Sequence, residues 1–317
     1  MRALVTGGSG FVGSNVVDKL RAHGVRVRIF DTIAPEFGTD AEFYQGTLLD
    51  LEALGAAMLR VNVVFHLAAV ADVKDVFENP HYSENINVRG TINVLEAARR
   101  SGVERVIYGS TTWVYGDVTE QYVDEKTRLS PPAHLYTATK IVSEYYCQCY
   151  GGLYDLPYTI LRYGIPYGPR ARDGAVIPIF VQKAMNGEPL TIAGDGSQFR
   201  QFVYVEDLAE GNVLALKSIA ANKVYNLDGA EKISIRQIAE TTQKLVGGVE
   251  IKNVSGRPGD FSGKEISSEL AKKELGWSPK VRFEEGLRNY IDWFTERKEQ
   301  NEALWSQLDE SLIEGLQ

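Results

Sequence analysis

The sequence predicts an α/β protein built on a parallel sheet with helices on both faces. Two observations lead to this prediction. Short apolar runs alternate with helical stretches through the first half of the chain, which is typical of a doubly wound sheet. A glycine-rich turn also joins the first apolar run to the first helical stretch. At 317 residues the chain is long enough for one large domain of this class or for two domains.

The elements are expected in a regular order. The run RALVTG is the first strand, and a helix follows from about Phe11 to His23, with Gly24 as its stop. The later strands are VRVRIFD, AEFYQG, VNVVFHLAA, ERVIYGS and PYTILRY. Helices are expected near residues 51–59, over about 81–101, and from after Pro131-Pro132 to Gly151-Gly152. The last of these helices contains the sequence LYTATK.

The pattern changes after about Pro166, where prolines and glycines become frequent and the strands become short. This change predicts a smaller, mixed α/β C-terminal lobe. We expect a first domain over residues 1–165, with about 202–226 returning to it, and a second lobe over 166–201 and 227–300. A C-terminal helix is expected over 301–317. Its apolar residues have a helical spacing that favours packing over partner binding, namely Leu304, Trp305, Leu308, Leu312 and Leu316.

The composition argues against several classes of function. A net charge of −8 and a pI near 5.2 leave no basic surplus for binding nucleic acid. The sequence contains no run of 18 apolar residues and starts without a signal-like leader, so we expect a cytoplasmic protein with no membrane partner. Cys147 and Cys149 lie two apart on an expected helix and point in different directions, which suggests neither a disulfide nor a metal site.

The turn TGGSGFVGSN predicts a dinucleotide site. Gly8, Gly10 and Gly13 fit G-x-G-x-x-G, and Gly7 with the last two fits G-x-x-G-x-x-G. Either pattern lets backbone N–H groups approach a pyrophosphate at a helix N-terminus. Asp31 ends the second strand, where an acid is expected to bind the adenosine ribose. No arginine follows Asp31 to accept a 2′-phosphate, so the sequence favours NAD over NADP. The alternative is a glycine turn with a structural role alone.

Tyr136 and Lys140 lie four apart on one face of an expected helix. This pattern alone is typical of an ordinary helix surface, but a nicotinamide cofactor gives it a chemical meaning. Hydride transfer at an alcohol carbon also moves the hydroxyl proton, and a lysine ammonium is expected to lower the pKa of a nearby tyrosine so that it can act as the base. Thr111 follows the fifth strand and is the candidate for holding the substrate hydroxyl; a threonine that caps a turn is the alternative.

With these residues in place, the chain resembles an extended short-chain dehydrogenase/reductase of the NAD-dependent sugar-nucleotide epimerase/dehydratase family. The resemblance extends to about Lys298. TGGSGFVG resembles the cofactor turn, HLAA the end of the fourth strand, and NVRGTINVLEAA the long helix. STTWVYG and YTATK resemble the two catalytic motifs, and GDGSQFRQFVYVEDLAEG and GRPGD resemble segments of the second lobe. The expected fold is therefore a Rossmann-type sheet with a smaller substrate lobe, and UDP-glucose/galactose 4-epimerases are its expected relatives.

The resemblance implies specific contacts. Thr111, Tyr136 and Lys140 are the expected catalytic residues, and no metal site is expected. The expected contacts with NAD are Gly7, Gly10, Phe11, Val12, Gly13, Asp31, Asp50, Leu51, Leu67, Ala68, Ala69, Asn87, Tyr136, Lys140 and Tyr163. The expected contacts with the nucleotide sugar are Thr111, Val176, Thr191, Arg200 and Arg257. The two arginines suit a diphosphate, although each alone is more typical of a surface ion pair. A homodimer through the helices near 81–101 and 134–150 is implied.

Three positions depart from the family pattern. Ile165 and Ala175 stand where the family often has asparagines that touch the substrate phosphates, and Arg170 or Arg172 could donate instead. Trp113 stands where related decarboxylases and 4,6-dehydratases have a glutamate. An indole is neither an acid nor a base. Its ring could line the pocket or pack in the core, and of these two alternatives we expect core packing.

The sequence thus predicts an NAD-dependent 4-epimerase of a nucleotide sugar, with UDP-hexose as the substrate class and a transient 4-keto intermediate. A dehydratase, a decarboxylase or a net oxidoreductase of the same family is the first alternative. The second alternative belongs to another class, a dinucleotide-binding regulator without catalysis. A regulator needs only the glycine turn, so the combination of Thr111, Tyr136 and Lys140 argues against it.

Overall fold

The computed structural model describes residues 1–116, 118–132, 134–255 and 263–314, and within 301–314 the backbone alone. Within these ranges the main sheet has seven strands, all parallel. In spatial order they are β11 (Lys223–Leu227), β7 (Tyr158–Tyr163), β5 (Arg105–Thr111), β4 (Val63–His66), β1 (Arg2–Thr6), β2 (Arg26–Asp31) and β3 (Glu42–Gln45). The strand order reverses beside β1, so a crevice opens at the carboxyl ends of β1 and β4.

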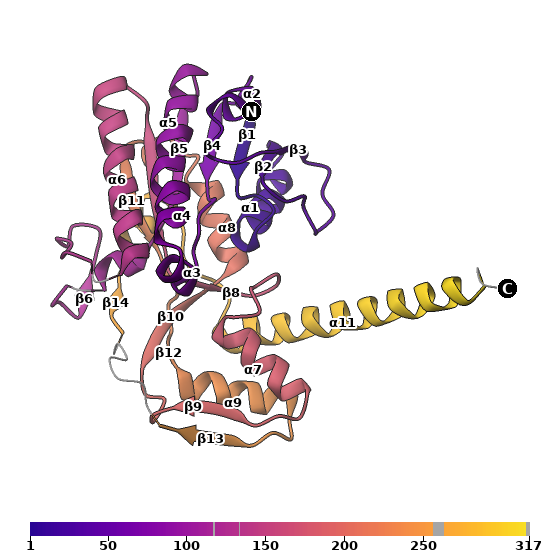
Figure 1. Ribbon diagram of the computed structural model, residues 1–317. Coiled ribbons are helices and arrows are strands. Elements are labelled where there is room, and N and C mark those ends of the chain that lie inside the picture. Colours follow the sequence, from indigo (N-terminus) through magenta and orange to yellow (C-terminus); the bar gives the residue numbers. More distant parts are fainter. Residues whose placement is uncertain (117, 133, 256–262, 315–317) are drawn as a thin grey trace.

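Helices cover both faces of this sheet (Figure 1). One face packs against α1 (Phe11–Ala22), α8 (Val205–Leu214) and α10 (Glu269–Leu275). The other packs against α2 (Leu51–Ala57), α5 (Gly90–Arg100) and α6 (Leu135–Tyr154). The central strands are buried along their length, because helices cover both faces of the sheet. This burial agrees with the short apolar runs that alternate with helical stretches in the sequence. The predicted Rossmann-type doubly wound fold is confirmed.

A second lobe with its own core lies beyond the carboxyl edge of the main sheet, in the lower part of Figure 1. Its sheets join β8 (Ile165–Tyr167), β10 (Phe199–Tyr204) and β12 (Lys232–Ser234), and separately β9 (Leu190–Ala193) and β13 (Ile251–Val254). The helices α7 (Val176–Met185) and α9 (Ile235–Val246) pack on these strands. A capping box in which Ser234 and Gln237 bond each other's backbone N–H starts α9.

The chain also contains several short elements and one long helix. They are α3 (Val73–Glu78), α4 (Pro80–Glu84), the π-helical segment η1 (Asn85–Arg89), the 3₁₀ turns η2 (Thr112–Tyr115) and η3 (Ser218–Ala220), the paired strands β6 (Tyr122–Val123) and β14 (Glu265–Ile266), and the long helix α11 (Phe283–Glu314). In the described residues no helix is both long and apolar enough to cross a membrane.

Several boundaries differ from the prediction. The helix expected over 81–101 starts at Pro80 and contains the π turn η1. Within this turn the carbonyl of Asn87 accepts the hydroxyls of Thr91 (2.6 Å) and Ser143 (3.0 Å). The helix expected to stop at Gly151-Gly152 continues to Tyr154 and ends at Asp155, whose φ of 53° is left-handed.

The later part of the chain differs as well. The return to the first sheet begins at α8, since residues 202–204 belong to β10 of the second lobe. The expected C-terminal helix is the end of α11, which projects away from the rest of the chain (Figure 1). The side chains of 301–314 and all of 315–317, on which the packing prediction rests, lie outside the described residues.

Candidate functional site

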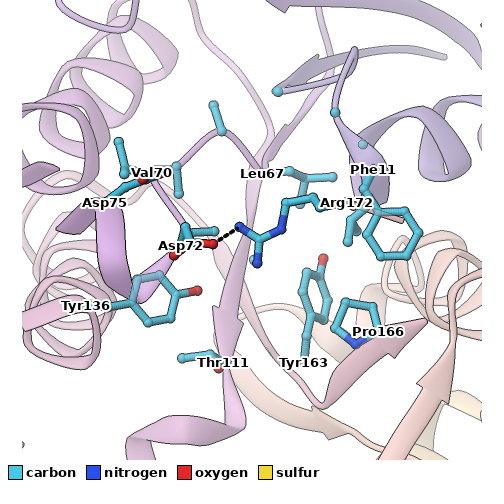
Figure 2. A pocket seen from close by; sticks show the side chains of 18 of the residues that line it. Phe11, Leu67, Val70, Asp72, Asp75, Thr111, Tyr136, Tyr163, Pro166 and Arg172 are labelled. Atoms are coloured by element: carbon cyan, nitrogen blue, oxygen red, sulfur yellow. Dashed lines mark hydrogen bonds and ion pairs between the residues drawn. The ribbon is translucent and has the colours of Figure 1, made fainter. Parts of the chain in front are cut away.

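A cavity of about 1060 Å³ lies at the carboxyl ends of the main-sheet strands, between that sheet and the second lobe. Figure 2 shows side chains from both parts pointing into it. Most of the predicted site residues line it: Gly7, Gly10, Phe11, Val12, Gly13, Asp31, Leu67, Ala68, Ala69, Thr111, Tyr136, Lys140, Tyr163, Val176 and Arg200. The carboxyl edge of such a sheet is where this fold class binds ligands.

The glycine turn brings the backbone close to this cavity. Gly7 has a φ of +72°, and a Cβ there would lie 2.7 Å from the Cα of Ala68. A Cβ on Gly13 would lie 1.9 Å from the carbonyl oxygen of Gly7. Gly10 caps α1 without a side chain, so the first N–H groups of the helix open toward the cavity. Only glycines allow this close approach, and the resulting cradle fits the pyrophosphate of a dinucleotide.

Asp31 ends β2 at the rim of the same cavity. Its Oδ2 accepts the backbone N–H of Ser9 at 3.0 Å, and its Oδ1 accepts that of Thr32 at 2.8 Å. The carboxylate is therefore fixed against the glycine turn, where it can accept hydrogen bonds from ribose hydroxyls.

Lys140 lies one turn after Tyr136 on α6 and is buried. Its Nζ donates to the carbonyl of Gly109 at 2.9 Å and lies 4.9 Å from the centre of the Tyr108 ring and 5.9 Å from that of Tyr136. Burial lowers the pKa of Lys140 to about 8, and the charge of Glu144 opposes this decrease. The amine is thus mainly an ammonium at neutral pH.

The expected lowering of the Tyr136 pKa by Lys140 is wrong for the chain alone. Desolvation raises the pKa of Tyr136 to about 12, and the charge that opposes this increase belongs to Arg172. Tyr136 is half-buried and lines the cavity, and its spacing from Lys140 along the helix could not show this environment. Thr111 lies 7% exposed at the end of β5, where its Oγ1 accepts the N–H of Trp113 at 3.2 Å.

The prediction that Trp113 packs in the core is also wrong. Trp113 is 39% exposed and lines the cavity. Its ring meets the Tyr136 ring edge-on, with 6.5 Å between the two ring centres. The 3₁₀ turn η2 buries its neighbours Thr112, Val114 and Tyr115 and turns the indole outward. The centre of its ring also lies 6.3 Å from that of the His134 ring, in a tilted arrangement.

Arg172 crosses the cavity from the second lobe. It is an exposed side chain whose Nη1 lies 3.3 Å from the Oδ2 of Asp72, as the dashed line in Figure 2 shows. Arg170 is held elsewhere, because its Nη2 lies 2.8 Å from Asp18 on α1. Of the two arginines considered as phosphate donors, Arg172 is the one that lines the cavity, together with Ile165 and Ala175.

Four predicted residues lie outside the cavity lining. Asp50 caps α2 by accepting the N–H of Ala53 at 2.9 Å, and Leu51 packs beside the core of that face. Asn87 is buried, and its amide bonds both backbone groups of Val70, at 2.8 and 3.0 Å, in the segment that follows β4. Thr191 is exposed on β9. Arg257 lies outside the described residues.

Sequence reasoning missed the segment after β4. Asp72, Asp75, Asn79 and Tyr82 line the cavity, yet none of them matches a motif that we used. The available signal was positional, because residues that follow a parallel strand lie at the carboxyl edge of the sheet.

Comparisons with known proteins agree with this arrangement. The model of the "NAD dependent epimerase/dehydratase family" matches residues 3–228. The chain is similar to a "Putative UDP-glucose 4-epimerase" of Methanocaldococcus jannaschii, with 33% identity over 92% of this chain and 97% of the other. It is also similar to a "UDP-N-acetyl-alpha-D-glucosaminuronate decarboxylase" of Bacillus cytotoxicus, with 32% identity over 93% of this chain and 98% of the other. Among solved structures, the UDP-glucose 4-epimerase of Thermotoga maritima with UDP-glucose matches with a TM-score of 0.87 and 33% identity, over 94% of this chain and 99% of the other.

Proposed function

The chain belongs to the NAD dependent epimerase/dehydratase family, and on that premise we propose that this enzyme is a 4-epimerase of a UDP-hexose. In this proposal the sugar is oxidised at C4 to a 4-keto intermediate, turns within the cavity and is reduced on its opposite face. No net oxidation results, so the cofactor is regenerated in every turnover.

The residues of the first sheet would hold NAD. The backbone of the glycine turn suits the pyrophosphate, and Asp31 suits the adenosine ribose. Lys140, which lines the cavity, would bind the nicotinamide ribose. When bound, NAD supplies the hydride acceptor and a nearby positive charge. Residues 166–201 and 227–300 would hold the nucleotide sugar.

Tyr136 is the proposed acid and base for the sugar 4-hydroxyl. Its pKa of about 12 in the chain alone means that it needs added positive charge to act as a phenolate near neutral pH. The bound cofactor would supply such charge, and Arg172 already acts in this direction. Thr111 would hydrogen-bond the reacting oxygen from the end of β5, and the keto oxygen would take its proton back from Tyr136.

The proposed diphosphate contacts are Arg200 and Arg257, with Val176 and Thr191 near the nucleotide. Arg200 lines the cavity from β10 of the second lobe. Arg172 is the proposed replacement for the family's asparagines at Ile165 and Ala175, because it is a cation on the same wall of the cavity.

One observation carries the choice of epimerisation. Trp113 presents an indole to the cavity beside Thr111 and Tyr136, so this position offers no acid or base for elimination or decarboxylation. The observation that favours a dehydratase or a decarboxylase is a pair of carboxylates, Asp72 and Asp75, on the segment that follows β4. Asp72 and Asp75 line the cavity, although Asp72 is paired with Arg172.

A panel of nucleotide sugars tests the proposal. The protein is incubated with NAD and UDP-glucose, UDP-galactose, UDP-N-acetylglucosamine or UDP-glucuronate, and the products are read by mass and NMR. We expect a 4-epimer of unchanged mass, and no turnover by Tyr136→Phe although it still binds NAD. A 4-keto-6-deoxy sugar, or carbon dioxide with a pentose product, would assign the rival reaction. Binding of NAD without turnover of any sugar would favour the regulator.

A homodimer through α4–α5 and α6 is part of the proposal. Several apolar and aromatic side chains are exposed on α6, among them Leu135 (52%), Val142 (39%) and Tyr145 (57%). Such a surface is typical of an interface between subunits. Light scattering should give twice the mass of one chain, and Tyr145→Glu should give a monomer.

A further inference from the structure

A buried polar network lies beneath the proposed catalytic residues. The Glu144 carboxylate on α6 accepts the Nε and Nη2 of Arg162 on β7 at 3.0 and 2.7 Å. It also accepts the hydroxyl of Ser110 on β5 at 2.6 Å. The Nη1 of Arg162 donates to the Tyr115 hydroxyl at 2.6 Å, which in turn donates to Asn226 on β11 at 3.0 Å. The network therefore joins one helix to three strands of the main sheet.

Both charges of this network are removed from water. The side chains of Glu144 and Arg162 are 3% and 6% exposed. A buried ion pair gives little net stability, because desolvation of the two charges offsets their attraction. The ion pair therefore contributes mainly by fixing the position of α6 relative to β7. The bidentate geometry allows only one register between α6 and β7.

Three members of the network, Ser110, Arg162 and Glu144, are next to residues of the proposed site. Ser110 precedes Thr111, and Arg162 precedes Tyr163. Glu144 lies one helical turn after Lys140, on the same face of α6. The hydrogen bonds of the network thus connect the backbone segments that present Thr111, Tyr163 and Lys140.

We propose that Glu144 is a positioning residue for the reaction: with Arg162 and Ser110 it holds α6 in register with the ends of β5 and β7, and its charge balances that of Lys140. The inference deepens the proposed function and rests on it, since Lys140 and Thr111 take their roles from it. Glu144 itself lies beneath these residues rather than in the cavity lining.

The effect of the Glu144 charge on Lys140 depends on the other groups that surround Lys140. The groups that act on it or lie nearest to it are Tyr136, Glu144 and Cys147 from α6, Tyr108 from β5 and His66 from β4. Among these, Glu144 is the carboxylate, and it opposes the effect of burial on the pKa of Lys140. Without the charge of Glu144, the effect of burial on Lys140 is less opposed, so the pKa of Lys140 decreases further.

The test is Glu144→Gln, which keeps the shape and an oxygen acceptor for Ser110 but removes the charge. With a UDP-hexose as substrate we expect kcat to decrease roughly 10- to 100-fold with little change in KM, as for a small displacement of catalytic groups. A second readout needs no turnover. NAD affinity is measured against pH, and its alkaline decrease should move to lower pH by roughly one unit as Lys140 loses its proton earlier.

The matched control is Glu42→Gln, which breaks the ion pair with the buried Arg28 at the far edge of the sheet. It should leave kcat and the pH dependence of NAD affinity unchanged. A folded Glu144→Gln protein with both quantities at wild-type values would overturn the inference.

Two further arms keep the inference testable. If Glu144→Gln does not fold, Ser110→Ala removes one bond and leaves the ion pair, and kcat should then decrease several-fold; a wild-type kcat would contradict the positioning role. If the wild-type protein turns over no nucleotide sugar, the proposed function fails, and the pH dependence of NAD affinity alone decides on Glu144.

Discussion

Replacement of Gly13 by alanine should damage the cofactor site. The new Cβ would lie 1.9 Å from the carbonyl oxygen of Gly7 and 2.9 Å from the Cα of Gly8, both backbone atoms. The turn must move from α1 by roughly 1 Å before such a contact is tolerable. Strain of this kind in a packed site costs about 1–3 kcal/mol of unfolding free energy.

The same displacement acts on NAD, because the N–H groups of this turn form the cradle for the pyrophosphate. We expect at least a tenfold loss of NAD affinity, which corresponds to about 1.4 kcal/mol. Thermal unfolding with and without NAD and a calorimetric titration measure the two effects.

Gly55 is the matched control. It lies within α2, and a Cβ there meets nothing within 4 Å. Gly55→Ala should stabilise the protein by roughly 0.5–1 kcal/mol, because alanine loses less conformational freedom in a helix. NAD affinity should not change. If Gly13→Ala behaved like Gly55→Ala in both measurements, the close approach of turn and helix would be refuted.

Changes at Asp31, Arg172 and His66 should each have a measurable effect. Asp31→Ala should weaken NAD more than NADP, and equal losses in two binding titrations would contradict its ribose role. Arg172→Gln removes the positive charge that lowers the pKa of Tyr136, so the acid limb of the pH–rate profile should move to higher pH. An unchanged acid limb would contradict this effect of Arg172 on Tyr136. Burial lowers the pKa of His66 to about 3, so protonation favours the unfolded state. Stability should therefore decrease between about pH 6.5 and 3, by up to about 1.4 kcal/mol per pH unit. His66→Gln should flatten this decrease in denaturation experiments.

The sequence predicted those parts of the site that depend on local spacing. The glycine turn, Asp31 at the end of β2, and the Tyr136–Lys140 pair on one helix face each follow from the geometry of a single element. Their meeting at one cavity follows from the parallel sheet, since its carboxyl ends share one edge.

The remaining features depend on contacts between distant segments. Asp72 and Arg172 lie 100 residues apart and meet across the cavity, which no local pattern encodes. The outward turn of Trp113 depends on how η2 buries the neighbours of that residue. The raised pKa of Tyr136 depends on desolvation by the whole fold. Burial and long-range pairing are therefore the properties that sequence reasoning could not supply.

The central claim is that C4 of the sugar loses and regains the same hydride within one cavity. The most direct test uses a UDP-hexose with deuterium at C4, incubated with the NAD-loaded protein and read by NMR and mass. Our account predicts that both 4-epimers form and that each keeps the deuterium at C4. Loss of the label to solvent, or its appearance in a product of lower mass, would contradict epimerisation through a retained cofactor.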